Sequence, residues 1–281
     1  MDPLQAVALG TIQGLTEFLP ISSSGHLVIS QHLFGLKESV LLFDISVHIG
    51  TLTAVIIYFR KDLRAIIDSV VRCIRLLLKG ETSLADIYED SYIKLTVFIV
   101  VGSIPTAMLG LWIHKVSDKL FSSVVIVGSM LVVTGVLLFM TGFLLWSTTW
   151  INKKGVTISQ FSIKKAIIVG LIQGVAIIPG ISRSGATIAG GLFLGLDKET
   201  AAKYSFLLSI PAILGAGILI FKDVHVYTAL PLKIMLIGFI TSGIVGYCSL
   251  RFLVHIVKKG QLHFFAPYCW LAGAMALIYG L

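Results

Sequence analysis

Long apolar segments separated by short polar ones dominate the pattern of side chains along the sequence. Six of these segments are long enough to cross a bilayer, because a spanning helix needs about 20 apolar residues. They are residues 42–59, 93–113, 121–146, 201–221, 231–250 and 262–281. The pattern therefore predicts an all-α integral membrane protein with six transmembrane helices.

Two further apolar segments, 4–19 and 166–178, are too short to span comfortably. Each runs into proline, serine and glycine and then into a second short apolar piece. This arrangement is typical of re-entrant helix pairs, which we predict over residues 4–35 and 166–196. Irregular backbone at membrane depth is tolerated only where protein or a water-filled cavity satisfies its polar groups, so both turns should line a polar site.

The two broken segments match one another without a gap when the sequence is shifted by 160 residues. The first segment contributes the matching residues Gly10, Ile12, Gln13, Gly14, Ile21, Ser22, Ser24 and Gly25. We therefore predict an internal repeat within one structural domain, with a first unit over 1–150 and a second over 151–281. Each unit would hold one re-entrant pair and three spans. An odd number of crossings turns the second unit over, which gives the repeat an inverted topology.

The charge distribution predicts how the chain is oriented. With 22 basic and 14 acidic residues, the formal charge is +8, while 56% of the residues are hydrophobic. In such a chain the excess of base indicates cytoplasmic loops rather than a nucleic-acid partner. We expect the base-rich segments 60–92, 147–165 and 251–260 in the cytoplasm and the segments 114–120 and 222–230 outside. The first re-entrant pair then opens outward.

Several classes of protein are excluded or disfavoured. Cys73, Cys248 and Cys269 are scattered, so they indicate neither a disulfide framework nor a zinc site. No basic segment precedes the first apolar stretch, and we therefore expect no cleaved signal peptide. The sequence contains no phosphate-binding G-x-x-x-x-G-K-[ST] motif and no H-E-x-x-H motif, so ATP-driven transport and zinc proteolysis have no support.

The first broken segment contains an acid, hydroxyl groups and a histidine in the stretch "EFLPISSSGHL". Glu17 and Gln13 are four residues apart, hence on one helical face. Glu17 could bind a metal, position a water or exchange a proton, or it could form a purely structural ion pair. His26 shares the turn with Ser23, so either Ser23 or a water could be activated, and the histidine itself could attack phosphorus. The other candidate binding groups of this turn are Ser22, Ser24 and Gly25.

The second broken segment contains "PGISRSGAT" and places Arg183 opposite Ser23 in the repeat. A planar guanidinium matches phosphate oxygens bidentately, whereas a salt bridge to Glu17 or Asp44 without a ligand role is the alternative. Asp44, with His48 one turn later, could complete a cation site. Further bonds to an anion, or close helix packing, are open to the neighbouring residues Ser182, Ser184, Gly185 and Thr187.

Together, "QGLTEFLPISSSGH" and "PGISRSGATIAGG" resemble the two signature motifs of the undecaprenyl-diphosphatase family, also called bacitracin-resistance proteins. The resemblance extends over essentially the whole chain. It implies a membrane hydrolase that converts undecaprenyl diphosphate to undecaprenyl phosphate and inorganic phosphate, recycles the carrier for cell-wall polymers and confers bacitracin resistance. It further implies a location in the bacterial inner membrane, a site open to the periplasmic side, and assistance by Mg²⁺ or Ca²⁺.

The family's E/Q-x-x-x-E pattern falls on Gln13 and Glu17, its serine and histidine on Ser23 and His26, and its arginine on Arg183. Many members have glutamate where this chain has Gln13. A glutamine makes a poor base and a weak metal ligand, which leaves Glu17 with that role. The resemblance does not identify the attacking group or the cation, nor the preferred chain length of the lipid, and the sequence is compatible with a homodimer.

Two other functions compete with this interpretation. A type-2 phosphatidic-acid phosphatase needs a histidine some six residues after the arginine and an aspartate four residues further on, but the chain has Ala189 and Phe193 there. A polyprenyl-phosphate flippase or transporter is the stronger rival, because inverted repeats with broken helices are transporter architecture. Release of phosphate by the purified chain, without a membrane, would separate a hydrolase from a pure transporter.

Overall fold

The computed structural model describes residues 1–36, 41–80, 89–120, 136, 139–140, 143–144, 146–150, 155–178, 180–223 and 231–280. This part of the chain is helical, apart from one isolated bridge between Val156 and Leu196. The helices are α1 (Pro3–Phe18), α2 (Ser23–Leu33), α3 (Leu41–Tyr58), α4 (Arg60–Lys79), α6 (Ser91–Leu120), α8 (Ile163–Val175), α9 (Arg183–Phe193), α10 (Lys198–Asp223), α11 (Leu232–Lys259) and α12 (Ala266–Gly280). The predicted all-α fold is confirmed.

Four helices are long and apolar enough to cross a membrane, and the chain is an integral membrane protein. These candidate spans are Leu41–Tyr58, Ser91–Ile113, Lys198–Leu219 and Leu232–Lys259. They confirm the spans predicted at 42–59, 93–113, 201–221 and 231–250. The span predicted at 121–146 lies mostly outside the described residues. The one at 262–281 corresponds to a 3-10 turn, Leu262–Phe265, and to α12, whose 15 residues are fewer than the roughly 20 of a full span.

Three segments predicted as loops are helical instead. The 60–92 loop contains α4, a 20-residue helix. Residues 251–259 continue α11, which ends only at the left-handed Gly260, and residues 114–120 belong to α6. In the last two cases the predictions ended the helix where charged residues begin. Basic side chains are favourable in the last turns of a helix, however, and long ones extend from the membrane into water, so a helix does not have to end at the membrane boundary.

The two predicted re-entrant pairs form two helical hairpins of the same local design, α1–α2 and α8–α9. Helices α2 and α9 begin and end 160 residues apart. Each starts at an N-cap serine, Ser22 or Ser182, whose hydroxyl accepts the backbone N–H three residues on, at 3.4 and 3.2 Å. Each is followed by a left-handed glycine, Gly35 or Gly195. The same sequence signals therefore start and stop both helices.

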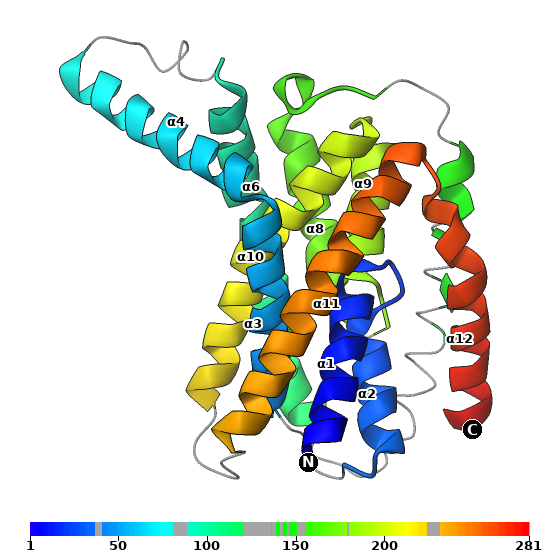
Figure 1. The fold of residues 1–281 in the computed structure, drawn as a ribbon. Coiled ribbons are helices and arrows are strands. Elements are labelled where there is room, and N and C mark those ends of the chain that lie inside the picture. The colour runs from blue at the N-terminus through cyan, green and yellow to red at the C-terminus, as the bar shows by residue number, and fades with distance from the viewer. Residues whose placement is uncertain are drawn as a thin grey trace.

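Figure 1 shows α1 and α2 in one half of the molecule and α8 and α9 in the other, with their connecting turns near the middle. Each hairpin packs against a helix from the opposite half of the sequence, α1 on α11 and α8 on α6. Backbones approach closely at these crossings. A Cβ atom added to Gly10 would lie 2.9 Å from the Gly238 carbonyl oxygen, and one added to Gly170 would overlap the carbonyl of Gly102. Small residues thus fix the position of both hairpins.

Aromatic side chains pack between the end of α1 and the neighbouring helices. Phe18, at the end of α1, meets Phe206 of α10 edge to face, with ring centroids 5.7 Å apart. The fully buried Tyr204 donates from its hydroxyl to the Phe98 carbonyl at 2.9 Å, which ties α10 to α6. The ends of α1 and α9 are therefore held by a packed core rather than by loops alone.

Candidate active site

A cavity of about 570 Å³ lies between the turns of the two hairpins. Its walls include apolar side chains such as Leu27, Ile181 and Ile213. The polar side chains that line it come from both hairpins and from α3: Thr16, Glu17, Ser23, Ser24, Gln31, Asp44, His48, Ser182 and Arg183. Apolar walls with a few converging polar groups suit a lipid that carries a charged headgroup.

Glu17 is the centre of the polar network in this cavity. Its side chain is only 4% exposed, and Arg183 forms a salt bridge with Oε1. The other oxygen, Oε2, accepts hydrogen bonds from Ser23 Oγ at 2.6 Å and from Gln13 Nε2 at 2.9 Å, and His48 Nε2 lies 3.9 Å away. The carboxylate therefore joins α1 to α2, α3 and α9. A buried charge needs such partners, since an unpaired one would be very costly.

Arg183 is the first residue of α9, directly after the N-cap Ser182. Its Nη2 contacts Glu17, while its Nη1 is buried and has no hydrogen-bond partner among the residues that the structure describes. An unsatisfied buried donor costs about 1–3 kcal/mol, and more when it is charged. The salt bridge to Glu17, which the sequence offered as the alternative to phosphate binding, is present, yet it uses only one side of the guanidinium. The Nη1 side has no such contact among the described residues.

The turn before α2 is strained. Ser22 has φ 67°, and no other non-glycine residue in the described part of the chain has a positive φ. His26 stabilises this conformation, because its Nδ1 donates to the Ser22 carbonyl at 2.8 Å. The equivalent Ser182 has an ordinary φ of −74°. The strained turn places the next residue, Ser23, on the Glu17 carboxylate.

His26 lies beside α12 and is not among the residues that line the cavity. Its Nε2 is 2.6 Å from the hydroxyl of Tyr268, and the two rings stack with centroids 5.6 Å apart. Since Nδ1 faces a carbonyl, the neutral ring carries its proton there, and Nε2 accepts from the tyrosine. Of the four predicted catalytic residues, the structure thus brings Glu17, Ser23 and Arg183 together and holds His26 through Tyr268.

The predicted binding residues divide into two groups. Ser24 and Ser182 line the cavity, and the hydroxyl of Ser184 lies 3.3 Å from that of Ser182. The remaining ones serve local structure: the Gly25 and Gly185 amides donate to the N-cap serines, and Thr187 donates to the Arg183 carbonyl at 2.7 Å and contacts Ser205. For Thr187 the structure therefore favours the packing alternative.

Asp44 lines the same cavity as Glu17 and accepts a hydrogen bond from Gln31 Nε2 at 2.7 Å. Within the described residues, no three His, Cys, Asp or Glu side chains are grouped as a complete metal site. Two carboxylates on one cavity nevertheless fit a hard divalent cation, because Mg²⁺ commonly takes its other ligands from water and substrate phosphates.

Sequence reasoning missed three polar residues of this region, namely Thr16, Gln31 and Tyr268. Gln31 lies on the same face of α2 as Ser23, two turns further along, so the helical period could have found it. Tyr268 is 242 residues away from His26. No periodicity or motif connects these two, and only the packing of α12 brings them together.

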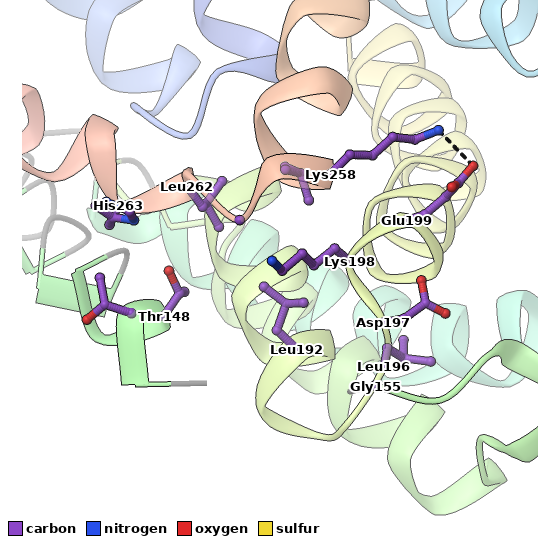
Figure 2. Close-up of a pocket in the computed structure, with 13 residues that line it drawn as sticks. Thr148, Gly155, Leu192, Leu196, Asp197, Lys198, Glu199, Lys258, Leu262 and His263 are labelled. Atoms are coloured by element: carbon purple, nitrogen blue, oxygen red, sulfur yellow. Dashed lines mark ion pairs between the residues drawn. The ribbon is translucent and has the colours of Figure 1, made fainter. Parts of the chain in front are cut away.

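A second cavity, of about 790 Å³, lies where α9, α10 and α11 approach one another, and none of the predicted site residues lines it. Figure 2 shows Lys198, Glu199 and Lys258 on its walls. Lys258 Nζ is 2.9 Å from a Glu199 carboxylate oxygen, and both side chains are about half exposed, at 48% and 59%. This ion pair thus lies near water, in contrast to the buried pair between the hairpins.

Comparison with known proteins agrees with the geometry. Residues 6–275 match the family model described as "Bacitracin resistance protein BacA". An undecaprenyl-diphosphatase from Desulfosudis oleivorans is 50% identical, and the match covers 100% of both chains. One from Desulforapulum autotrophicum is 48% identical over 100% of this chain and 99% of its own, and one from Methanobrevibacter smithii is 40% identical over 99% and 98%.

Proposed function

The chain belongs to the bacitracin resistance protein BacA family, and we propose that it is an undecaprenyl-diphosphatase whose active site is the cavity between the two hairpins. The observation that carries this proposal is the contact between Glu17 and Arg183, two residues 166 positions apart that bring one motif each to the same cavity. The reaction is hydrolysis of undecaprenyl diphosphate to undecaprenyl phosphate and inorganic phosphate.

Arg183 binds the diphosphate headgroup. Its Nη1 lacks a partner within the described residues, and a guanidinium forms strong charge-assisted bonds to phosphate oxygens. The N-termini of α2 and α9 lie at the same cavity and add the favourable end of two helix dipoles. These groups stabilise the negative charge that develops on the leaving undecaprenyl phosphate.

Ser23 supplies the attacking oxygen. Its hydroxyl already donates to Glu17 at 2.6 Å, so the carboxylate is placed to accept that proton as the oxygen attacks the terminal phosphorus. The bond between the two phosphates breaks, and undecaprenyl phosphate leaves. Water then releases inorganic phosphate from Ser23. His26 contributes by holding the Ser22 carbonyl, and hence the turn that positions Ser23.

A divalent cation, Mg²⁺ or Ca²⁺, is the proposed cofactor. Glu17 and Asp44 are the residues that would hold it, since both carboxylates line the cavity. The cation supplies charge neutralisation for the diphosphate oxygens. Phosphate release should therefore be lost on chelation and restored by adding either ion back.

The proposed architecture is an inverted repeat of six spans and two re-entrant pairs, with units over 1–150 and 151–281. The 160-residue offset of α2 and α9 supports it, as does the position of the two hairpins in opposite halves of the molecule (Figure 1). The basic segments 60–92 and 251–260 belong on the cytoplasmic side by the positive-inside rule. The cavity then opens to the periplasmic side of a bacterial inner membrane.

The test is phosphate release from a polyprenyl diphosphate by the purified chain in detergent. We expect cation-dependent release, its loss in Glu17→Ala and Arg183→Ala, and near-normal release in Lys258→Ala, which alters the other cavity. A chain that binds the lipid but releases no phosphate would be a transporter instead. Near-normal turnover in Glu17→Ala or Arg183→Ala would show that the substituted residue is not part of the active site.

A further inference from the structure

Helix α4 carries an apolar stripe that the described part of the protein leaves uncovered. Ile67, Val71, Ile74 and Leu78 follow one another at intervals of four, three and four residues, which places them on one helical face. They are 61%, 49%, 52% and 83% exposed. A continuous exposed apolar stripe marks an interaction surface.

A charged stripe runs beside it along the same helix. Its spacing of three or four residues again defines one face, and all of its members are exposed. Five are basic and one is acidic: Lys61, Arg64, Asp68, Arg72, Arg75 and Lys79. Asp68 offsets only one of the five positive charges, and its Oδ2 lies 3.9 Å from Arg64 Nε. The surface is therefore apolar along one line and cationic along the next.

The remaining face of α4 fixes the helix to the protein. Asp62 forms a salt bridge with Lys203 of α10 at 2.7 Å, and the buried Ser69 donates to Asp90 at 3.1 Å. Leu63 and Ile66 pack against the core. Because these contacts fix the rotation of α4 about its own axis, its two exposed stripes have a defined direction.

Helix α4 lies at one end of two membrane spans. It begins two residues after α3 ends at Tyr58, and α6 begins at Ser91. Figure 1 shows it extending away from the bundle at the end opposite to the N-terminus. An apolar face next to a basic one matches the boundary between acyl chains and anionic headgroups. A soluble acidic partner would use the basic stripe but leave the apolar one in water.

We propose that α4 is an interfacial helix that binds anionic phospholipids of the membrane which the chain spans. Its apolar stripe enters the acyl boundary, and its basic stripe contacts the phosphate headgroups. This surface is distinct from the active site, because no α4 residue lines the cavity between the hairpins. The inference therefore does not depend on the proposed reaction.

The test uses the full chain in lipid nanodiscs, with and without phosphatidylglycerol in phosphatidylcholine. A fluorophore is attached at Leu78→Cys on the apolar stripe or at Asp68→Cys on the charged stripe, in a background that lacks Cys73 and Cys248. We expect a quencher on the lipid acyl chains to reach the label at position 78 and not the one at 68. Phosphatidylglycerol should increase the quenching at position 78, and high salt should reverse that increase.

A charge-reversed variant sharpens the test. Each basic residue near an anionic surface strengthens the attraction about fivefold, so Arg64→Glu, Arg72→Glu and Arg75→Glu together should remove the effect of phosphatidylglycerol. Quenching at position 78 that is the same in both lipid mixtures would overturn the anionic preference. Access of a water-soluble quencher to position 78 in both mixtures would show that the apolar stripe lies in water and would overturn the proposal. The two labels in the unreversed chain decide this even if the triple variant fails to fold.

Discussion

The two hairpins share a backbone design but differ in the side chains at their turns. Both have an N-cap serine, an amide donating to it, and a left-handed glycine at the far end. At the turn itself, the first hairpin has Ser23 where the second has Arg183. The first also carries Glu17, and the strained Ser22, where the second has Ile177 and a relaxed Ser182.

This difference shows how two hairpins of one backbone design can supply the two sides of an asymmetric site. The repeated parts, namely caps and close glycine contacts, set the positions of the two turns. The parts that differ supply a carboxylate and hydroxyl on one side and a guanidinium on the other. Because the contact between Glu17 and Arg183 joins the two sides, neither hairpin has a complete site alone. The following substitutions make the hairpins more alike or more different.

The largest effect is expected for Arg183→Ser, which gives the second turn the residue of the first. It removes the guanidinium that donates to the headgroup, and it leaves the buried Glu17 carboxylate without its positively charged partner. Turnover should therefore fall about 10²–10³-fold or more. Arg183→Lys should retain part of the activity, because lysine keeps the positive charge but cannot bind phosphate oxygens bidentately as a guanidinium does. Phosphate release by the purified variants is the measurement, and equal turnover in all three proteins would contradict the assignment.

Ser23→Ala should have the next largest effect. It removes the proposed attacking oxygen, and we expect a loss of about 10²-fold, the residual rate coming from water at the same place. The control is Ser249→Ala on α11, whose hydroxyl donates to the Val245 carbonyl and does not line the cavity; we expect it to stay within a few-fold of the parent chain. If Ser23→Ala retains full turnover, a water molecule rather than Ser23 attacks the terminal phosphorus.

Gly170→Ala should destabilise the fold more than Gly10→Ala. An added methyl group overlaps the Gly102 carbonyl in the first case and lies 2.9 Å from the Gly238 carbonyl in the second. Overpacking of this kind costs about 1–3 kcal/mol. Thermal unfolding in detergent measures it, with Gly215→Ala as the control, since no described residue beyond its own stretch of helix comes within 4 Å of that Cβ position. Equal losses at both crossings would mean that the helices simply move apart.

Substituting glycine for the N-cap serines should separate the strained turn from the relaxed one. Ser182→Gly loses a cap and adds chain entropy, a cost of about 0.5–1 kcal/mol. Ser22→Gly also relieves a positive φ, so its stability should be unchanged or higher, while turnover falls because Ser23 is held less firmly. Thermal unfolding and phosphate release are measured on both variants. A lower stability of Ser22→Gly than of Ser182→Gly would contradict this expectation.

Tyr268→Phe should have the smallest effect. It keeps the ring that stacks on His26 and removes only the hydroxyl at Nε2, so we expect a loss of turnover of less than about tenfold with unchanged stability. Tyr268→Ala should cost more, because it also removes the stacking. Tyr247→Phe on α11 is the control. A pH–rate profile identical to that of the parent would show that the hydroxyl does not act through His26.

Patterns that repeat locally were predictable from the sequence. The four long apolar runs became α3, α6, α10 and α11, and proline, serine and glycine correctly marked the two turns. For the same reason the sequence singled out Gln13, Glu17, Ser23 and Arg183, which the structure joins in one network. The contact between Glu17 and Arg183 was foreseen as an alternative rather than as the expected outcome.

Features that depend on tertiary packing or on mixed polarity were not predictable. Helix α4 has no apolar run, because its charged and apolar residues alternate around the helix, and it was mistaken for a loop. The direction of His26 depends on Tyr268, which comes from the other end of the chain. The strain at Ser22 is a property of the folded turn, and the residue types in the turn do not predict it.

The most direct test of a shared site is an experimental structure of the purified chain with a non-hydrolysable polyprenyl diphosphate analogue. The account predicts the diphosphate between Ser23 Oγ and Arg183 Nη1, in contact with both hairpins. Finding it instead in the cavity of Figure 2, against Lys198 and Lys258, or bound to one hairpin alone, would contradict the central claim.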